Sequence, residues 1–196
     1  MPQALSSPIL WSWSAKIEIY IDYKCPLCIF FSKELLPMLE SYALENRIEL
    51  TYKYPSLLYP ETIVSYDDSQ AVLCAHSLGR FQEFKKELPI ARPTIKSDAE
   101  LLSKYLAVAK NIWISSSDFE NCMIEKKVQP LMSANLREFQ KIWGVDLPIV
   151  IMNGKIIDRK ILQNREWFSS YLARFFWRST DEIQSEIQRR SQVELK

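Results

Sequence analysis

Apolar and polar residues alternate over two short segments in the first third of the chain. Ile17, Ile19 and Ile21 share one face of the first segment, and Ile48 and Leu50 begin the same pattern in the second, which runs to Tyr54. A period of two is typical of half-buried strands, so the sequence predicts strands over residues 17–22 and 48–54. A right-handed crossover between them would make the two strands parallel.

Helical periodicity fills the stretch between these strands, from Pro26 to about Asn46, and Pro37 predicts a kink or a restart within it. The expected buried stripe consists of Ile29, Phe30, Leu35, Leu36, Leu39 and Tyr42.

A longer helical region follows the second strand. Apolar residues recur at helical spacing from a cap at Ser69 to about Phe139, with a stop at Gly79 and a second cap at Asp98. No strand pattern interrupts this stretch of roughly 70 residues, which has the size of an ordinary subdomain. The sequence therefore predicts an all-helical subdomain inserted after the second strand.

A hairpin and a helix close the predicted fold. The apolar run 148–152 is followed by Asn153-Gly154 and then by residues 155–158, and Asn-Gly between two such runs is a strong hairpin signal. A final helix should pack its apolar stripe on the sheet. That stripe consists of Trp167, Phe168, Tyr171, Leu172, Phe175 and Phe176.

The expected organisation has four parts. Residues 1–66 and 141–178 form the two halves of one α/β domain, residues 67–140 form the inserted helical subdomain, and residues 179–196 form a charged tail. In the tail, Ser179 and Glu182 fit a capping box, so it is expected to be a short helix, either solvated or in contact with another copy.

Composition excludes several classes of protein. The 196 residues are 47% hydrophobic and 25% charged, as in a soluble globular protein. Three glycines cannot form a Gly-rich phosphate loop, and a formal net charge of +1 gives no field for nucleic acid.

The first 14 residues carry no positive charge and no continuous apolar core, so they do not resemble a signal peptide, and no apolar run is long enough to span a membrane. We expect an extracytoplasmic location, in the periplasm or cell envelope, if a leader or anchor was removed, and a cytoplasmic one otherwise.

The sequence Cys25-Pro26-Leu27-Cys28 carries the chemistry, because two thiols at this spacing can close and reopen a disulfide. The motif lies where the first strand ends and a helix begins, so free N–H groups, the helix dipole and Lys24 would stabilise a thiolate. We expect Cys25 to be the solvent-reached nucleophile and the more buried Cys28 to resolve it. Half of a zinc site is the alternative, but it would need a second cysteine pair.

Together these residues resemble the DsbA-like disulfide oxidoreductases of the thioredoxin superfamily. The resemblance covers about residues 16–176 and rests on the CPLC motif at a strand-to-helix junction, the helical insertion, and the run 144–149 directly before an Asn-Gly hairpin. It implies a thioredoxin fold with an inserted all-helical subdomain. It also implies disulfide exchange with cysteine-containing proteins and a redox partner that recycles the pair, without metal or other cofactor.

In that family a cis-proline loop faces the active cysteines, and Pro148 matches its position. The resemblance then implies that the backbone N–H and C=O of Leu147 pair with an extended substrate. The alternative is a trans proline that starts an edge strand.

Two departures from the family pattern change the expected redox properties. Leu27 stands where strongly oxidising members carry His, so we expect a less oxidising disulfide. Ile19 stands where the family commonly keeps a buried acid. Glu18 and Asp22 alternate onto the opposite face, so neither is expected to relay protons.

Cys74 and Cys122 lie on apolar helix faces of the insertion. Some DsbA-like proteins brace this subdomain with a disulfide, which the resemblance makes possible here, and two free cysteines packed as small hydrophobes are the alternative. His76 should face away from Cys74, so a Cys-His site is not expected.

Two other functions remain open. A glutathione-linked transferase or isomerase of the kappa type shares the inserted fold but usually has serine in place of the first cysteine. A binding or chaperone module would use the groove at Pro148 and keep Cys25 and Cys28 only for structure.

Overall fold

The computed structural model describes residues 9–10, 15–23, 25–45, 47–55, 68–88, 98–142 and 146–176. The predictions for Lys24, for most of the first 14 residues and for the tail 179–196 lie outside these ranges. The chain forms two compact units. One contains Tyr20–Cys28 and Tyr52–Leu147, and the other contains Ile9–Ile19, Ile29–Thr51 and the chain from Pro148 onward.

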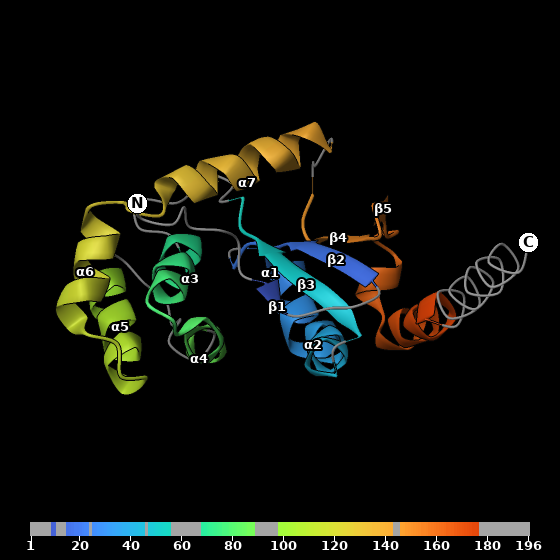
Figure 1. Ribbon diagram of the computed structural model, residues 1–196, viewed down its shortest axis with the longest axis horizontal. Coiled ribbons are helices and arrows are strands. Elements are labelled where there is room, and N and C mark those ends of the chain that lie inside the picture. Colours follow the sequence, from blue (N-terminus) through green and yellow to red (C-terminus); the bar gives the residue numbers. More distant parts are fainter. Residues whose placement is uncertain are drawn as a thin grey trace, which may run out of the picture. The chain divides into compact units, whose positions relative to one another are not determined.

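A five-stranded sheet, with strand order β1-β3-β2-β4-β5, forms the framework of the fold (Figure 1). Its strands are β1 Ile9–Leu10, β2 Ala15–Tyr20, β3 Ile48–Lys53, β4 Ile149–Met152 and β5 Lys155–Ile156. β1 runs antiparallel to β3, and β5 runs antiparallel to β4. The N–H of Ile21 donates to the carbonyl of Lys53 over 3.1 Å, so β2 and β3 end side by side, as parallel neighbours do.

The alternation that predicted β2 and β3 reflects burial on one face. Ile17 and Ile19 of β2, and Ile48 and Leu50 of β3, are fully buried, while the residues between them are partly exposed. The alternation stops where β2 ends, because the residues from Tyr20 to Tyr23 are all buried.

The helix after the cysteine motif is continuous but changes its winding. α1 spans Pro26–Phe30, a π-helical stretch η1 spans Phe31–Leu35, and α2 spans Leu36–Leu44. The N–H of Leu36 bonds to the carbonyl of Phe31, five residues back, immediately before Pro37. The predicted irregularity at Pro37 is therefore a π turn, a known way to accommodate a helix distortion.

This π turn shifts the buried stripe relative to the one predicted. Phe31 is fully buried, together with Leu35, Leu36 and Leu39. Ile29, Phe30 and Tyr42 are only half-buried, so the prediction for those three residues was wrong. A regular helical period projects the wrong residues inward once one turn contains an extra residue.

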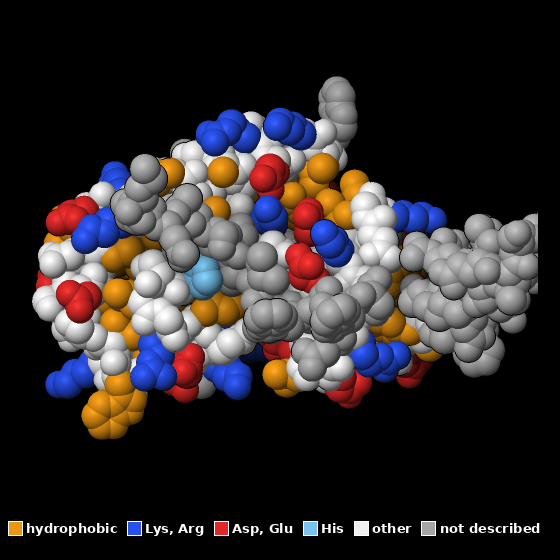
Figure 2. All heavy atoms as spheres, viewed as in Figure 1, with side chains coloured by type: hydrophobic (Ala, Val, Ile, Leu, Met, Phe, Trp, Pro, Cys, Tyr) orange, Lys and Arg blue, Asp and Glu red, His pale blue; other side chains and the backbone are white. Residues whose placement is uncertain are grey.

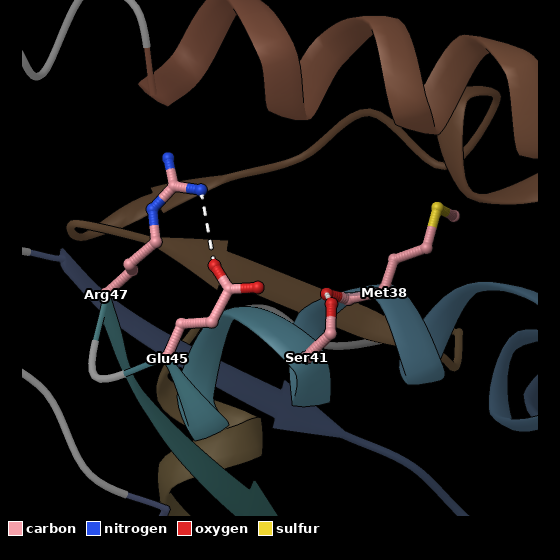
Figure 3. A network of polar contacts seen from close by, with 4 residues as sticks. All are labelled: Met38, Ser41, Glu45 and Arg47. Carbon is pink, nitrogen blue, oxygen red and sulfur yellow. Dashed lines mark hydrogen bonds and ion pairs between the residues drawn. The ribbon is translucent and has the colours of Figure 1, made fainter.

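At the end of α2 the polar contacts lie on the surface. The Ser41 hydroxyl donates to the carbonyl of Met38 over 2.8 Å, and Arg47 pairs with Glu45 at 3.6 Å (Figure 3). The Arg47 guanidinium also lies 4.6 Å from the ring centroid of Tyr42. Exposed pairs of this kind contribute little to stability. Side chains of both charge signs are likewise interspersed over the face in Figure 2, in keeping with a formal net charge of +1.

Five helices form the region between β3 and β4 in the described chain. They are α3 Asp68–Ser77, α4 Phe81–Glu87, α5 Asp98–Asn111, α6 Ser116–Ile124 and α7 Gln129–Lys141. α3 packs on α4 and α6, and α5 packs on α6. The rings of Phe84 on α4 and Phe119 on α6 are stacked with their centroids 5.3 Å apart. A disulfide joins Cys74 on α3 to Cys122 on α6. His76 packs its ring edge-on against Phe81 instead of approaching a cysteine.

The Asn-Gly hairpin is confirmed. Asn153 and Gly154 adopt φ values of +48° and +79°, the left-handed conformations that a type I′ turn requires and that these two residue types tolerate. Asn153 also exchanges two hydrogen bonds of 2.8 Å with the backbone of Lys16, one through its side-chain oxygen. The turn therefore anchors β4 beside β2.

The chain beyond β5 passes through η2, a 3₁₀ turn at Ile161–Gln163, and is helical from 165 to 176. Phe168 and Leu172 are buried as predicted, and Phe168 packs edge-on against Phe31. Trp167, which the predicted stripe included, is 57% exposed, so that part of the prediction was wrong. The Trp167 N–H is capped by the side chain of Asn164, which places this tryptophan in the first helical turn.

Candidate active site

The two cysteines of the motif lie at the start of α1, as the sequence predicted. The N–H of Cys25 donates to the carbonyl of Asp22 over 3.1 Å, which holds the turn that precedes the helix. Within the first turn, the N–H of Cys28 donates to the sulfur of Cys25 over 3.3 Å. Both cysteines are free thiols, with Cys25 8% and Cys28 1% exposed. Cys25 is thus the more accessible of the two, although it is more buried than expected.

The environment shifts the pKa values of the two thiols in opposite directions. Hydrogen bonding from the Cys28 side chain lowers the pKa of Cys25 from 9.0 to about 6, against the opposing effect of burial, with further help from the backbone N–H groups of Cys28 and Leu27. The same side-chain hydrogen bond, together with burial, raises the pKa of Cys28 far above its ordinary value. Since the thiolate is the reactive species, this difference makes Cys25 the candidate nucleophile of the pair.

Leu147 lies directly against Cys25, although it is 122 residues away in the sequence. The Cys25 thiol donates to its backbone carbonyl over 3.4 Å. Leu147 is 3% exposed and immediately precedes Pro148 and β4. Two residues that the family resemblance assigned to one site are therefore brought together. Pro148 is buried, and its cis isomer remains a prediction.

The remaining motif residues occupy the helix start. Pro26 is the first residue of α1 and is exposed, where its missing N–H leaves no helical hydrogen bond unmade. Leu27 is half-buried between the two cysteines, and its backbone N–H contributes to the lowered pKa of Cys25.

Sequence reasoning named Asp22 but expected it to have no role at the cysteines. It is fully buried, and its negative charge disfavours a thiolate at both Cys25 and Cys28. The alternation of β2 would place it on the opposite face, but β2 ends at Tyr20, so the period of two no longer applies at position 22. The signal that was available is an acid inside an apolar run three residues before a reactive cysteine.

A buried polar cluster adjoins this segment. The rings of Tyr23 and Tyr54 are stacked with centroids 6.0 Å apart, and burial raises the pKa of both. The Lys85 ammonium group donates to the hydroxyl of Tyr52 over 3.3 Å. Burial, followed by the charge of Lys86, lowers the pKa of Lys85 to about 7. Sequence reasoning did not single out Lys85, because a lysine on a helix is normally solvated.

The comparisons with known proteins agree with this geometry. A protein-family model described as Thioredoxin matches residues 14–172. The chain belongs to the thioredoxin family. A search of curated proteins found no match.

Solved structures with this thioredoxin fold include DsbA-like proteins of bacteria. BdbD from Bacillus subtilis is 14% identical, with a TM-score of 0.70 over 86% of this chain and 91% of that one. DsbA of Chlamydia trachomatis is 17% identical, with a TM-score of 0.61 over 86% and 91%. MdbA, a thiol-disulfide oxidoreductase from Corynebacterium diphtheriae, is 16% identical, with a TM-score of 0.62 over 80% and 86%. The predicted DsbA-like fold, a thioredoxin fold with a helical insertion, is thereby confirmed.

No helix among the described residues is long and apolar enough to cross a bilayer. The described part of this thioredoxin-family chain also contains no group of three or more His, Cys, Asp or Glu side chains that could hold a metal ion.

Proposed function

We propose that this thioredoxin-family protein is a thiol:disulfide oxidoreductase that exchanges disulfides with cysteine-containing proteins through Cys25 and Cys28. One observation carries the proposal. The Cys25 thiol, with a pKa lowered to about 6, lies one helical turn before the Cys28 thiol, whose pKa is raised, and the backbone N–H of Cys28 donates to the Cys25 sulfur. A thiolate at neutral pH next to a protonated partner is what one nucleophilic and one resolving cysteine require.

In the oxidising direction, a substrate thiolate attacks the Cys25 sulfur of the Cys25–Cys28 disulfide. The intramolecular S–S bond breaks, a mixed disulfide forms on Cys25, and Cys28 leaves as a thiolate that takes up a proton. A second substrate thiolate then attacks the substrate sulfur of the mixed disulfide. Cys25 leaves with the electron pair, so the substrate gains a disulfide and the protein is left as a dithiol.

The reducing direction uses the same steps in reverse. The Cys25 thiolate attacks a substrate disulfide, and Cys28 then attacks the Cys25 sulfur to release the reduced substrate. In either direction the protein must be returned to its starting state by a partner with compatible thiol or disulfide chemistry. Leu147, whose carbonyl accepts a hydrogen bond from the Cys25 thiol, and Pro148, the next residue in the chain, are the proposed substrate-binding residues. Pro26 and Leu27 shape the motif.

Paired serine substitutions test the function. We expect Cys25→Ser to abolish both the oxidation of a reduced, unfolded client protein and the reduction of insulin. Cys28→Ser should instead accumulate a mixed disulfide with the client on Cys25, visible by mass spectrometry. Full exchange activity in Cys25→Ser would overturn the proposal. A Cys25→Ser protein that conjugates glutathione would identify the transferase alternative. One that only holds unfolded client protein would identify the chaperone alternative.

A further inference from the structure

The Cys25 sulfur lies where a small molecule can approach it more easily than another protein can. Cys25 is 8% exposed, and the backbone carbonyl of Leu147 lies 3.4 Å from its sulfur. Cys28, the second thiol of the pair, is 1% exposed. Access to the two sulfurs is therefore narrow, which favours a small co-substrate over a bulky one.

Polar backbone groups lie around this sulfur. The N–H of Cys28 donates to it over 3.3 Å, and the Leu147 carbonyl lies within hydrogen-bonding distance of it. Because the pKa of Cys25 is lowered to about 6, the sulfur is a thiolate at neutral pH. The carbonyl can then accept a hydrogen bond from an O–H group of a molecule that reacts with the thiolate.

Hydroperoxides meet the requirements of size, hydrogen bonding and reactivity together. Hydrogen peroxide is smaller than any cysteine-containing substrate, and its O–H groups can donate to a carbonyl. A thiolate that reacts with it becomes a sulfenic acid, which condenses with a neighbouring thiol to form a disulfide. Cys28 is such a thiol, one helical turn further along the chain and joined to Cys25 by the N–H···S hydrogen bond.

We propose that a hydroperoxide is a further co-substrate of this site and converts the Cys25–Cys28 dithiol into the disulfide without a protein partner. The Cys25 thiolate attacks one oxygen of the peroxide, the O–O bond breaks, and the leaving hydroxide takes up a proton from solvent. Cys25 is then a sulfenic acid. The Cys28 sulfur attacks the Cys25 sulfur, the S–O bond breaks, and the hydroxyl leaves as water with the Cys28 thiol proton.

The peroxide reaction extends the proposed function, and its use in catalysis rests on that function. The two electrons of the dithiol reduce one hydrogen peroxide to two waters. Two thiols of a client protein can then reduce the Cys25–Cys28 disulfide by exchange and so become a disulfide themselves. The complete cycle oxidises a client dithiol with a hydroperoxide as the terminal oxidant.

Acidity alone would make Cys25 only slightly faster than free cysteine towards a peroxide. At pH 7 a thiol with a pKa of about 6 is about 90% thiolate, whereas free cysteine is about 3% thiolate. This advantage of about thirtyfold shrinks to about two- to threefold, because the nucleophilicity of a thiolate falls with its pKa. A site that also orients the peroxide adds about tenfold for each hydrogen bond that strengthens as charge develops.

The rate of reaction with hydrogen peroxide tests the proposal. With the reduced protein at pH 7, we expect a second-order rate constant at least about twentyfold above that of free cysteine, and one Cys25–Cys28 disulfide for each peroxide consumed. The larger tert-butyl hydroperoxide should be disfavoured more strongly by the protein than by free cysteine, because access to the sulfur is narrow. A rate within about threefold of that of free cysteine would overturn the proposal, since acidity alone explains it.

Substitutions of the cysteines assign the steps. Cys25→Ser should lose the reaction. Cys28→Ala should stop at a sulfenic acid on Cys25, which dimedone traps for mass spectrometry. That assay is run at about pH 9, because loss of Cys28 raises the pKa of Cys25. The matched control, Cys74→Ala with Cys122→Ala, removes the other two cysteines and should keep the rate. A Cys28→Ala protein without the trapped sulfenic acid would contradict the proposed steps.

Disulfide exchange with a reduced client protein, measured on the same samples without peroxide, separates this proposal from the proposed function. The protein is first oxidised with glutathione disulfide, so that its disulfide does not depend on peroxide. Normal exchange together with a peroxide rate near that of free cysteine rejects the hydroperoxide alone. Rapid formation of the Cys25–Cys28 disulfide by peroxide, without exchange to the client, rejects the proposed function and the complete cycle built on it.

Discussion

The backbone N–H of Cys28 points at the sulfur of Cys25 from 3.3 Å, and the Cys28 side chain is the main cause of the low pKa of Cys25. Cys28, the proposed resolving cysteine, is therefore also the residue that makes the Cys25 thiol more acidic. One side chain performs two tasks because the first helical turn places position 28 over position 25.

Alkylation rates measure this relationship. In the reduced protein we expect the reaction of Cys25 with iodoacetamide to reach half its maximal rate near pH 6, because only the thiolate reacts. Cys28→Ala removes the largest cause of the low pKa, so the midpoint should move up towards the ordinary value of 9.0. An unchanged midpoint in Cys28→Ala would show that the helix start alone sets the acidity.

The negative charge of Asp22 disfavours the Cys25 thiolate, so neutralising Asp22 should lower the pKa of Cys25. In Asp22→Asn we expect the alkylation midpoint of Cys25 to fall below that of the unmodified protein, by less than Cys28→Ala raises it. The matched control is Glu18→Gln, which neutralises a half-buried acid on β2 and should leave the midpoint in place. A rise of the midpoint in Asp22→Asn would contradict the assigned sign.

We expect the residue at position 27 to influence the reduction potential of the Cys25–Cys28 pair through the stability of the Cys25 thiolate. A histidine at this position would be a donor beside the Cys25 sulfur and would stabilise the reduced form. Each pH unit by which Leu27→His lowers the pKa of Cys25 corresponds to about 1.4 kcal/mol, or about 30 mV towards a more oxidising potential. Equilibration with glutathione measures the potential, and Leu27→Ala, without a donor, serves as the control.

The disulfide between Cys74 and Cys122 should stabilise the helical region by restricting the unfolded chain. Its cysteines are separated by 48 residues. A closed loop of this size corresponds to about 4 kcal/mol in the chain-entropy treatment. We expect Cys74→Ala with Cys122→Ala to lower the free energy of unfolding by about that amount in urea. At urea concentrations below the unfolding transition, disulfide exchange at Cys25 should persist in this variant. Loss of exchange there would indicate that the Cys74–Cys122 disulfide takes part in exchange directly.

Lys85 should make stability depend on pH. Its pKa is about 7 in the folded protein against 10.5 ordinarily, so between these values the unfolded chain binds a proton that the folded chain does not. The free energy of unfolding therefore rises with pH over that window. Lys85→Met removes the titrating group, so we expect a flatter profile of the urea midpoint against pH, whereas Lys110→Met, which removes an exposed lysine, keeps the slope. The same slope in Lys85→Met as in the unmodified protein would show that other groups cause the pH dependence of stability.

Some elements were predictable because the interactions that form them are local. The Asn153-Gly154 turn needs two residues that tolerate positive φ, and the sequence supplies both. The cysteine pair could be placed at a helix start because a strand pattern ends and a proline follows within a few residues. Asp22 could not be placed in the same way, because its burial depends on where β2 leaves the sheet.

The helix after the motif shows the limit of periodicity. Pro37 signalled an irregularity, but its form, a π turn over Phe31–Leu35, decides which side chains face inward. The exposed Trp167 shows the same limit, because an apolar side chain in the first turn of an amphipathic helix can still lie outside the packed stripe.

The sequence by itself determined the chemistry of this protein: two thiols at a strand-to-helix junction, a hairpin, and the strand and helix order of the thioredoxin fold. These follow from short-range patterns that act within a few residues of chain. Only the tertiary structure decided what surrounds the reactive sulfur. The carbonyl of Leu147 reaches Cys25 from 122 residues away, because the fold brings together segments that no local pattern relates.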